Sequence, residues 1–334
     1  MQKYLEKRNH KVSIINYVPE NTSISHFFVK SLKFRHCVGN ILRLYLYPFY
    51  LYRKHLFYLY RKKYLNLSSL YKEKIDTSCY DVIITGSDQT FNLNYPFAKT
   101  YYQPFRKRES QKKIAYAPSF GSYDISLLPK EMENFLKDFD SLSCRESSGA
   151  VSLSNKIDKP VNSVFDPVFL LSKKKWEAVL NARPLKDGYV FVYDLNGKDN
   201  LVKFALNNCK GKPVVVYSND LMFQIRYKKN SNISFIKCLS VDDFLSYIYF
   251  ADYVFTDSFH GTAFSIIFEK QFYTYIALNN AANRIYNLLD SLKLRSRIVE
   301  TNAVDCSIID YTSVLTRLNY FVLNSQNYLK QNDL

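Results

Sequence analysis

Residues 253–268 read Tyr-Val-Phe-Thr-Asp-Ser-Phe-His-Gly-Thr-Ala-Phe-Ser-Ile-Ile-Phe. The first four residues predict a buried strand, and the apolar residues from Thr262 to Phe268 predict a helix. A short polar loop lies between them, in which Ser258 or Thr262 can cap the helix. A strand that passes through a short loop into a helix is the repeating unit of parallel α/β sheets, so this stretch predicts the fold class.

The same alternation of strand, loop and helix recurs along the chain. Strands are predicted at 12–17, 80–85, 113–117, 141–144, 161–165, 189–193, 214–217, 253–256 and 272–276. Helices are predicted at 129–139, from 147 onward, and at 198–208, 242–250, 262–268 and 311–329. The pattern restarts after the lysine-rich stretch 173–176, which indicates a second doubly wound domain. We predict two Rossmann-like domains, 1–172 and 173–308, and a helix within 309–334 that packs back on the first.

The composition is that of a folded protein with an anionic partner. The chain has 334 residues, and its 46 Lys and Arg against 30 Asp and Glu give a formal charge of +16. These values exclude a peptide hormone or a disordered chain and predict nucleic acid, a phosphorylated substrate or an anionic membrane as partner. The six cysteines lack metal-type spacing, and no stretch resembles a signal peptide or a membrane span. We expect reduced thiols and a cytoplasmic protein.

Much of the positive charge lies in one segment, residues 21–72. The segment contains ten Lys and Arg, no Asp or Glu, and many interleaved Tyr and Phe. Pro48 interrupts it, so we predict an insertion of two helices in the first domain. Such a surface suits anionic lipid headgroups, and packing of the helices on their own domain is the alternative. Nucleic acid ranks last, because no motif that reads it is present.

Glycines and serines at strand ends are candidates for substrate binding. The eight glycines form no dinucleotide or phosphate-loop fingerprint. In open α/β sheets, however, ligands bind at the carboxyl ends of strands, where glycine lets the backbone approach a ligand closely. An ordinary turn explains each glycine as well. The candidate substrate-binding residues of this kind are Gly86, Ser87, Ser119, Gly121, Ser258 and Gly261.

His260 lies in the polar loop before the predicted helix 262–268. A helix N-terminus attracts phosphate or carboxylate, and histidine can contact phosphate or transfer a proton near neutral pH. A structural histidine that only satisfies backbone groups is the alternative. Asp88 and Asp257 follow predicted strands and are candidates for an acid, a base or a group that orients His260, whereas loop capping explains them equally well.

Two arginines are placed like anion clamps. Arg145 closes the predicted strand 141–144, and Arg284 follows the polar loop after 272–276. Guanidinium groups bind carboxylate or phosphate through two parallel hydrogen bonds, which suits a small dianionic substrate. A salt bridge with an acid such as Glu146 or Asp290 is the alternative for both.

Taken together and in this order, five motifs resemble the polysaccharide pyruvyl transferase family. They are GSDQTFN at 86–92, IAYAPSFG at 114–121, RESSG at 145–149, DPVFLL at 166–171 and TDSFHGT at 256–262. With Asn283-Arg284 the resemblance reaches from the first helix to about Val299.

The resemblance implies two Rossmann-like domains that face a cleft in a GT-B-like arrangement. It implies transfer of a pyruvyl group from phosphoenolpyruvate to a sugar of a cell-surface polysaccharide or its lipid-linked precursor, usually as a ketal. By motif match His260 would be the acid/base or contact phosphate, Arg145 would bind phosphoenolpyruvate, and Arg284 would be a further basic ligand. The transfer reaction that the resemblance implies requires neither a cofactor nor a metal.

One departure from the family pattern concerns the first domain. Relatives usually carry a strand and an Asn-Tyr-Gly loop before the helix that matches residues 1–8, so we expect the first domain to lack this strand. The leading hypothesis is a cytoplasmic pyruvyl transferase at the inner face of the membrane. Two other hypotheses are a GT-B-type glycosyltransferase that uses a nucleotide sugar and a truncated, non-catalytic relative that binds glycan or membrane.

Overall fold

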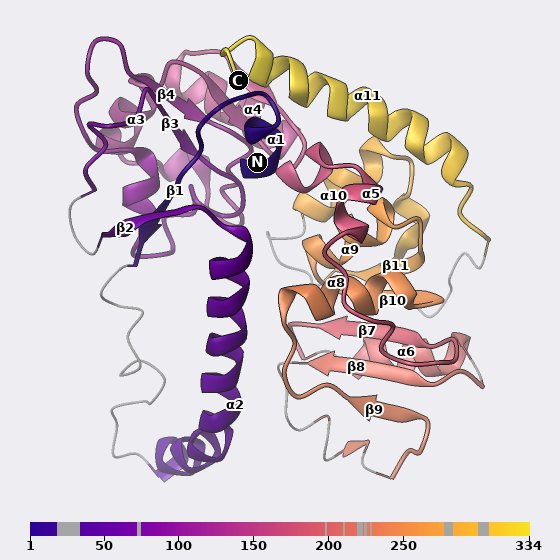
Figure 1. Cartoon of the computed structure of the whole chain (residues 1–334). Coiled ribbons are helices and arrows are strands. Elements are labelled where there is room, and N and C mark those ends of the chain that lie inside the picture. The colour runs from indigo at the N-terminus through magenta and orange to yellow at the C-terminus, as the bar shows by residue number, and fades with distance from the viewer. Residues whose placement is uncertain are drawn as a thin grey trace.

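A computed structural model gives the structure of the chain. It describes residues 1–18, 34–71, 75–197, 199–209, 211–218, 223, 226–227, 229–276, 283–299 and 307–334, with the backbone alone at 34–43, 45 and 46. Two α/β units lie at the upper left and lower right of Figure 1, and the long helix α2 (Phe34–Tyr64) runs beside the second. The part of the predicted insertion at 21–33 lies outside the described residues.

The second domain is built on a six-stranded parallel sheet. Its strands are β7 (Val190–Asp194), β8 (Val214–Ser218), β9 (Ile233–Phe235), β10 (Tyr253–Thr256), β11 (Gln271–Tyr275) and β12 (Ile298–Val299). They stand in the order β12-β11-β10-β7-β8-β9, the doubly wound order that reverses between β7 and β10. The central strands are apolar on both faces, because helices cover both sides of the sheet.

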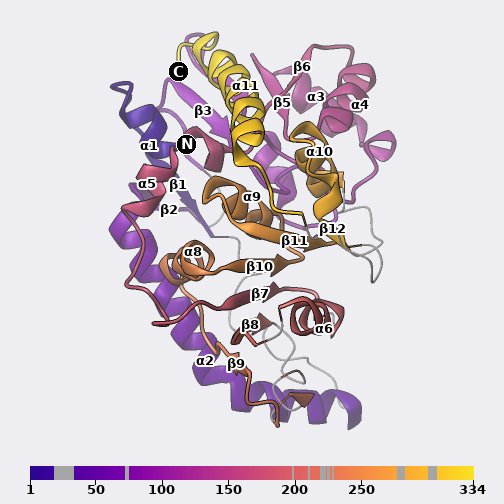
Figure 2. The ribbon, with the colours of Figure 1, turned by 90° about the vertical axis from the view of Figure 1, so that its right-hand side faces the viewer.

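Among the described residues, the sheet is covered by α6 (Asp199–Asn208), α8 (Val241–Phe250), α9 (Phe259–Ile267) and α10 (Asn283–Ser291), as Figure 2 shows. On one face, Leu245 of α8 and Ala263 of α9 pack against Phe191 of β7. On the other face, Val202 of α6 packs with Val192 of β7. The short 3₁₀ segment η7 (Arg295–Arg297) precedes β12.

The first domain carries shorter parallel pairs. β3 (Val82–Thr85) pairs with β4 (Lys112–Ala115), and β5 (Leu142–Cys144) pairs with β6 (Val161–Ser163). A bridge between Ile114 and Ser141 joins β4 to β5. The other elements are η3 (Ala98–Tyr102), η4 (Ile125–Leu127), α3 (Lys130–Lys137), α4 (Ser147–Ile157), η5 (Pro167–Leu170) and α5 (Lys173–Glu177). Both domains are therefore α/β with parallel strands, and the predicted fold class of two Rossmann-like domains in a GT-B-like arrangement is confirmed.

A separate parallel pair flanks α2 in the sequence. β1 (Ile14–Tyr17) follows α1 (Gln2–Glu6) and pairs with β2 (Leu67–Tyr71). Residues 67–71 were predicted as part of a helical insertion, and this prediction was wrong. The stretch Leu-Ser-Ser-Leu-Tyr has little intrinsic strand preference, so its conformation depends on pairing with the distant β1.

Residues 34–64 of the basic aromatic segment form one long helix. Two helices separated at Pro48 were predicted, but α2 continues through this proline. The helix is bent in Figure 2, and an internal proline is the usual cause of a bend because it removes one backbone hydrogen bond. Two arginines tie α2 to both domains: Arg61 donates to Asn16 of β1 at 2.6 Å, and Arg53 donates to Tyr217 of β8 at 3.4 Å. None of the described helices is long and apolar enough to cross a bilayer.

The last helix, α11 (Tyr311–Lys330), runs from the second domain to the first (Figure 1). The hydroxyl of Tyr328 donates to the carbonyl oxygen of Ala115 at 2.9 Å, and Ser325 Oγ accepts from the Phe165 amide at 2.9 Å. Leu329 is fully buried in the same contact. The helix thus packs on the end of β4 and the segment after β6.

Truncation of Leu329 tests this contact. Leu329→Ala leaves a cavity beside β4, so the free energy of unfolding should fall by about 2 to 5 kcal/mol in urea titrations. Leu323→Ala is the matched control, because Leu323 lies on the same helix, is 51% exposed and should change stability by less than about 0.5 kcal/mol. Equal effects of the two substitutions would contradict the packing described.

Candidate active site

The candidate site lies where strand-end loops of the two domains meet. Asp88 follows β3, Arg145 follows β5, and Asp166 follows β6. From the second domain, His260 lies in the first turn of α9 and Arg284 in the first turn of α10. Parallel strands direct their carboxyl ends to one edge of a sheet, and the two edges face each other here.

Arg145 is the central cation of the site. Its side chain is only 3% exposed, and its guanidinium donates to Asp166 at 2.8 Å and to Asp88 at 3.2 Å. Its Cζ lies 4.4 Å from the ring centroid of Phe259, so it also stacks on the second domain. Arg145 Nε is buried without a hydrogen-bond partner. One buried cation therefore joins strand ends of the first domain to α9 of the second.

Asp166 is the buried anion that pairs with Arg145. Its carboxylate is 1% exposed and accepts hydrogen bonds from Arg145, from the Ser87 hydroxyl and from the Val168 amide. Burial alone would raise its pKa, but the charge of Arg145 and these hydrogen bonds outweigh burial and lower it. Asp166 is therefore an anion at neutral pH. Asp166 was not among the predicted site residues, although its place after a predicted strand was a usable signal.

Asp88 bridges the two arginines across the domain boundary. Its Oδ1 accepts from Arg145 and from Arg284, each at 3.2 Å, while its side chain stays 59% exposed. Its backbone is left-handed, with φ +74, and its carbonyl oxygen accepts from the Ser119 amide at 2.7 Å. Burial raises the pKa of Asp88, but the charges of Arg145, His260 and Arg284 together lower it by more. The pKa of Asp88 is therefore below its usual value. Arg284 Nε is buried without a hydrogen-bond partner.

His260 sits at the N-terminus of α9 and reaches toward the first domain. Ser258 caps the helix, with its Oγ accepting from the Gly261 amide at 3.4 Å. The imidazole Nε2 lies 4.0 Å from Asp166 Oδ2, and the side chain is 39% exposed. His260 is therefore close to the buried anion and still accessible from a cavity.

Glu146 is a second acid beside the arginines. It precedes α4, accepts from the Ser119 hydroxyl at 2.6 Å, and lies 3.9 Å from Arg145 Nε. Burial raises its pKa, and the opposing effects of Arg145 and Ser119 do not cancel this rise. Glu146 was predicted only as a counter-ion, because burial of its carboxyl group does not follow from the residues around it in the sequence.

Asp257 is not brought into the cluster. Its two carboxylate oxygens accept from the backbone amides of Leu195 and Asn196, each at 2.8 Å, and from the Asn196 side chain. It holds the loop after β7, which is the capping role that the sequence left open. This geometry favours that role, and a catalytic role for Asp257 stays a prediction.

The three candidate glycines differ in their surroundings. Gly121 has φ +58, and a Cβ there would collide with the side chain of Gln89. A Cβ on Gly261 would lie 2.4 Å from Thr256 Oγ1, so this glycine is needed for packing of α9 on β10. A Cβ on Gly86 would meet nothing within 4 Å. Ligand contacts at these positions stay predictions.

The larger cavity, of about 1110 Å³, lies between α2 and the second domain. His260 and Ser258 line one part of it, and Arg53, Lys54 and Arg61 of α2 line another. Its aromatic lining residues are Tyr50, Phe57, Tyr58, Tyr60, Trp176, Tyr193, Tyr217, Phe244 and Phe264. The cavity is thus basic and aromatic, and His260 connects it to the ion cluster.

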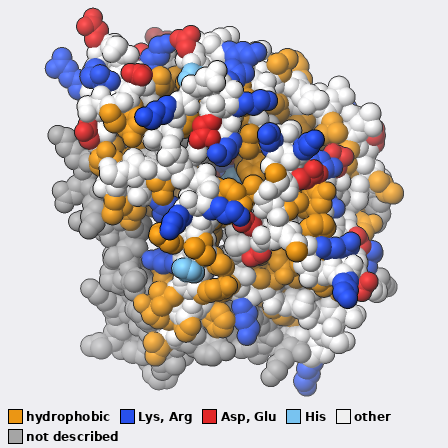
Figure 3. Space-filling view, viewed as in Figure 1, with side chains coloured by type: hydrophobic (Ala, Val, Ile, Leu, Met, Phe, Trp, Pro, Cys, Tyr) orange, Lys and Arg blue, Asp and Glu red, His pale blue; other side chains and the backbone are white. Residues whose placement is uncertain are grey.

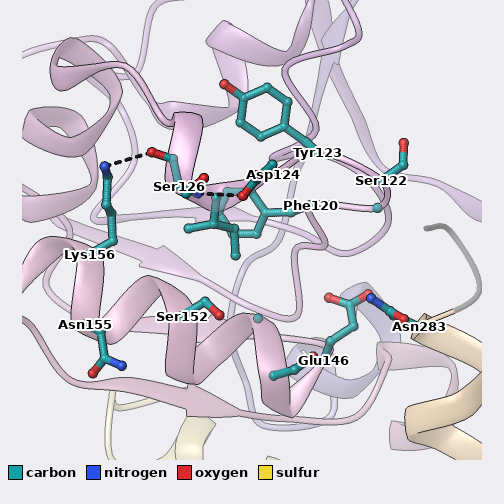
Figure 4. Close-up of a pocket in the computed structure, with 14 residues that line it drawn as sticks. Phe120, Ser122, Tyr123, Asp124, Ser126, Glu146, Ser152, Asn155, Lys156 and Asn283 are labelled. Carbon is teal, nitrogen blue, oxygen red and sulfur yellow. Dashed lines mark hydrogen bonds between the residues drawn. The ribbon is translucent and has the colours of Figure 1, made fainter.

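The smaller cavity, of about 740 Å³, lies between the loop 120–126 and α4 (Figure 4). Its lining includes Gly121, the start of α4, and Asn283 of α10. In Figure 4 the Glu146 carboxyl group points toward Asn283, and Lys156 donates to the carbonyl oxygen of Ser126. Glu146 therefore borders the smaller cavity, and His260 borders the larger one. No metal-binding group of His, Cys, Asp or Glu occurs among the described side chains.

The model of the polysaccharide pyruvyl transferase family matches residues 1–280. The matched range contains Asp88, Arg145, Asp166 and His260 but not Arg284. The chain belongs to this family, whose members are transferases. A comparison with curated proteins finds no significant match.

Among solved structures, the chain is similar to several UDP-N-acetylglucosamine 2-epimerases. The enzyme from Neisseria meningitidis, bound to UDP-GlcNAc, is 10% identical with a TM-score of 0.45, over 98% of this chain and 88% of that one. The enzyme from Methanocaldococcus jannaschii is 13% identical with a TM-score of 0.44, over 96% and 87%. A putative epimerase from Listeria monocytogenes is 12% identical with a TM-score of 0.41, over 70% and 71%. These similarities are too low to assign a function.

The lowered pKa of Asp166 predicts how stability depends on pH. An unfolded aspartate has a pKa of about 3.9. The stabilisation by the ion pair is complete above that pH and is lost as the pH falls through the lower, folded-state pKa. Asp166→Asn should therefore reduce the free energy of unfolding by about 3 to 5 kcal/mol at neutral pH, and the difference from wild type should shrink in urea titrations toward about pH 3.

The control is Asp158→Asn, an exposed aspartate at the end of α4 with φ +52, a conformation that asparagine tolerates. The free energy of unfolding of Asp158→Asn should equal that of the wild type at every pH. A constant difference between Asp166→Asn and wild type across the pH range would contradict the ionised pair.

Proposed function

We propose that the protein transfers a pyruvyl group from phosphoenolpyruvate to two hydroxyl groups of a saccharide, forming a pyruvate ketal. The saccharide would belong to a cell-surface polysaccharide or its lipid-linked precursor. The observation that carries the proposal is the cluster of Arg145, Arg284 and Asp88 next to His260, which lines the larger cavity. Phosphoenolpyruvate bears a carboxylate and a phosphate, and guanidinium groups bind both.

An anionic substrate would compete with Asp88 for Arg145 and Arg284. Its carboxylate is the exposed member of the cluster and contacts both arginines, whereas Asp166 is buried beneath Arg145. A substrate carboxylate or phosphate would replace Asp88 on Arg284 and on one side of Arg145. Asp166 would remain in place and keep Arg145 oriented.

The chemistry requires one proton donor and two nucleophilic hydroxyl groups. His260 would protonate the methylene carbon of phosphoenolpyruvate, which becomes a methyl group, and positive charge would develop at the adjacent carbon. One sugar hydroxyl attacks that carbon and loses its proton, and the carbon–oxygen bond to phosphate breaks. The second hydroxyl then closes the ketal and releases another proton. The arginines would stabilise the departing phosphate.

The larger cavity is the proposed acceptor site. Its aromatic walls and few polar groups are typical of pockets that bind organic ligands, and His260 lines it. The proposed location is the cytoplasm, at the inner face of the membrane, where a lipid-linked precursor would be met.

Ligand-dependent unfolding tests the donor. At about a hundredfold excess over its Kd, phosphoenolpyruvate should stabilise the protein by about 2.7 kcal/mol. Arg284→Gln should abolish this stabilisation because it removes one of the two guanidinium groups. Arg295→Gln is the matched control, since Arg295 lies nearby in sequence, is 63% exposed and pairs with Asp290. Stabilisation by UDP instead of phosphoenolpyruvate would move the assignment to a nucleotide-sugar transferase.

His260→Gln separates binding from turnover. The variant should still be stabilised by phosphoenolpyruvate, but phosphate release with a lipid extract as acceptor should fall by about 100-fold or more. Turnover of His260→Gln at the wild-type rate would remove His260 from the mechanism. Absence of turnover in the wild type with every acceptor would favour a non-catalytic glycan-binding protein.

A further inference from the structure

The outward face of α2 exposes large apolar side chains. Leu44, Leu51 and Tyr58 recur every seven residues, which is about two helical turns, so they stand above one another on one side of the helix. Leu44 is 64% exposed and Tyr58 is 59% exposed. Leu59 is exposed beside them. In Figure 3, hydrophobic side chains gather around a histidine at the lower left, over the position of α2 in Figure 1.

This face does not belong to the core, because the opposite side of α2 makes the contacts with the rest of the protein. Arg53 donates to Tyr217 of β8, and the carbonyl oxygen of Phe49 accepts from the Cys238 thiol. Tyr60 lines the cavity against the second domain. These contacts fix the rotation of the helix about its axis, so the leucines cannot turn inward.

The charge of the same helix is positive throughout. Residues 21–72 include ten Lys and Arg and no Asp or Glu. On α2, Lys54, Lys62 and Lys63 are exposed, although Lys54 also lines the larger cavity and Lys63 lies 3.9 Å from Asp242. Leucine and tyrosine interspersed with lysine are typical of helices that lie in the interface of an anionic bilayer. A second copy of the chain fits this face less well, because two such helices would bring like charges together.

We propose that the outward face of α2 docks on a lipid bilayer that carries anionic headgroups. Leu44, Leu51 and Leu59 enter the boundary between headgroups and acyl chains, and the lysines contact the anionic headgroups. Tyr58 lies at the edge of this face and also lines the larger cavity, so docking brings that cavity next to the membrane surface. Docking of this face does not depend on the transfer reaction. A result that contradicts docking would therefore leave the proposed reaction unchanged.

Vesicle sedimentation of the full chain, without substrate, tests the docking. Wild type should sediment with vesicles of phosphatidylcholine and phosphatidylglycerol and much less with phosphatidylcholine alone. Leu51→Glu combined with Leu59→Glu should weaken binding at least about tenfold. Lys62→Gln should weaken it about fivefold, and added salt should weaken it further.

Leu323→Glu is the matched control, because it adds the same charge at an exposed leucine of α11, and it should bind like wild type. Unchanged thermal unfolding establishes that each variant is folded. Equal sedimentation of wild type and the double variant, or equal binding to both kinds of vesicle, would overturn the proposal. So would a wild-type dimer in solution that the double variant dissociates, since the face would then belong to a second copy of the chain.

Discussion

The buried charge of Arg145 is the constraint on which the site depends. A guanidinium that water hardly reaches must be neutralised by nearby anions and hydrogen-bond acceptors, because an unpaired charge in the interior is very costly. Asp166 supplies one anion from the end of β6, and Asp88 supplies the other from the loop after β3. The same guanidinium stacks on Phe259 of α9. Satisfying one charge therefore sets the mutual position of three strand ends and of the second domain.

Two helices of the second domain begin close to the charge of Arg145. Arg284 of α10 shares Asp88 with Arg145, and His260 of α9 lies 4.0 Å from Asp166. The hydroxyl of Ser147 at the start of α4 adds a bond of 2.7 Å to Asn287 of α10. Polar contacts of this kind join two domains without burying an apolar interface between the reactive groups. Glu146 lines the smaller cavity and His260 lines the larger one, so the cluster borders space for two substrates, which a transfer reaction requires.

α2 links the site to the outer surface. One side of the helix forms a wall of the larger cavity with Arg53, Lys54 and Arg61, and the other side exposes leucine and tyrosine to solvent. A single helix of 31 residues can serve both purposes because its side chains point in all directions around the axis. The segment that carries most of the unusual charge of the chain is thereby placed beside His260.

Local pattern alone determined much of this protein. The strand, loop and helix at 253–268, the alternation that defines two α/β domains, and the placement of Arg145, Asp88 and His260 at strand ends all follow from periodicity over a few residues. Tertiary structure decided the rest. Only folding pairs Arg145 with Asp166, directs Asp257 to the loop after β7, makes 67–71 a strand and carries α2 through Pro48. Each of these depends on contacts between residues far apart in the chain, and such contacts override local preference.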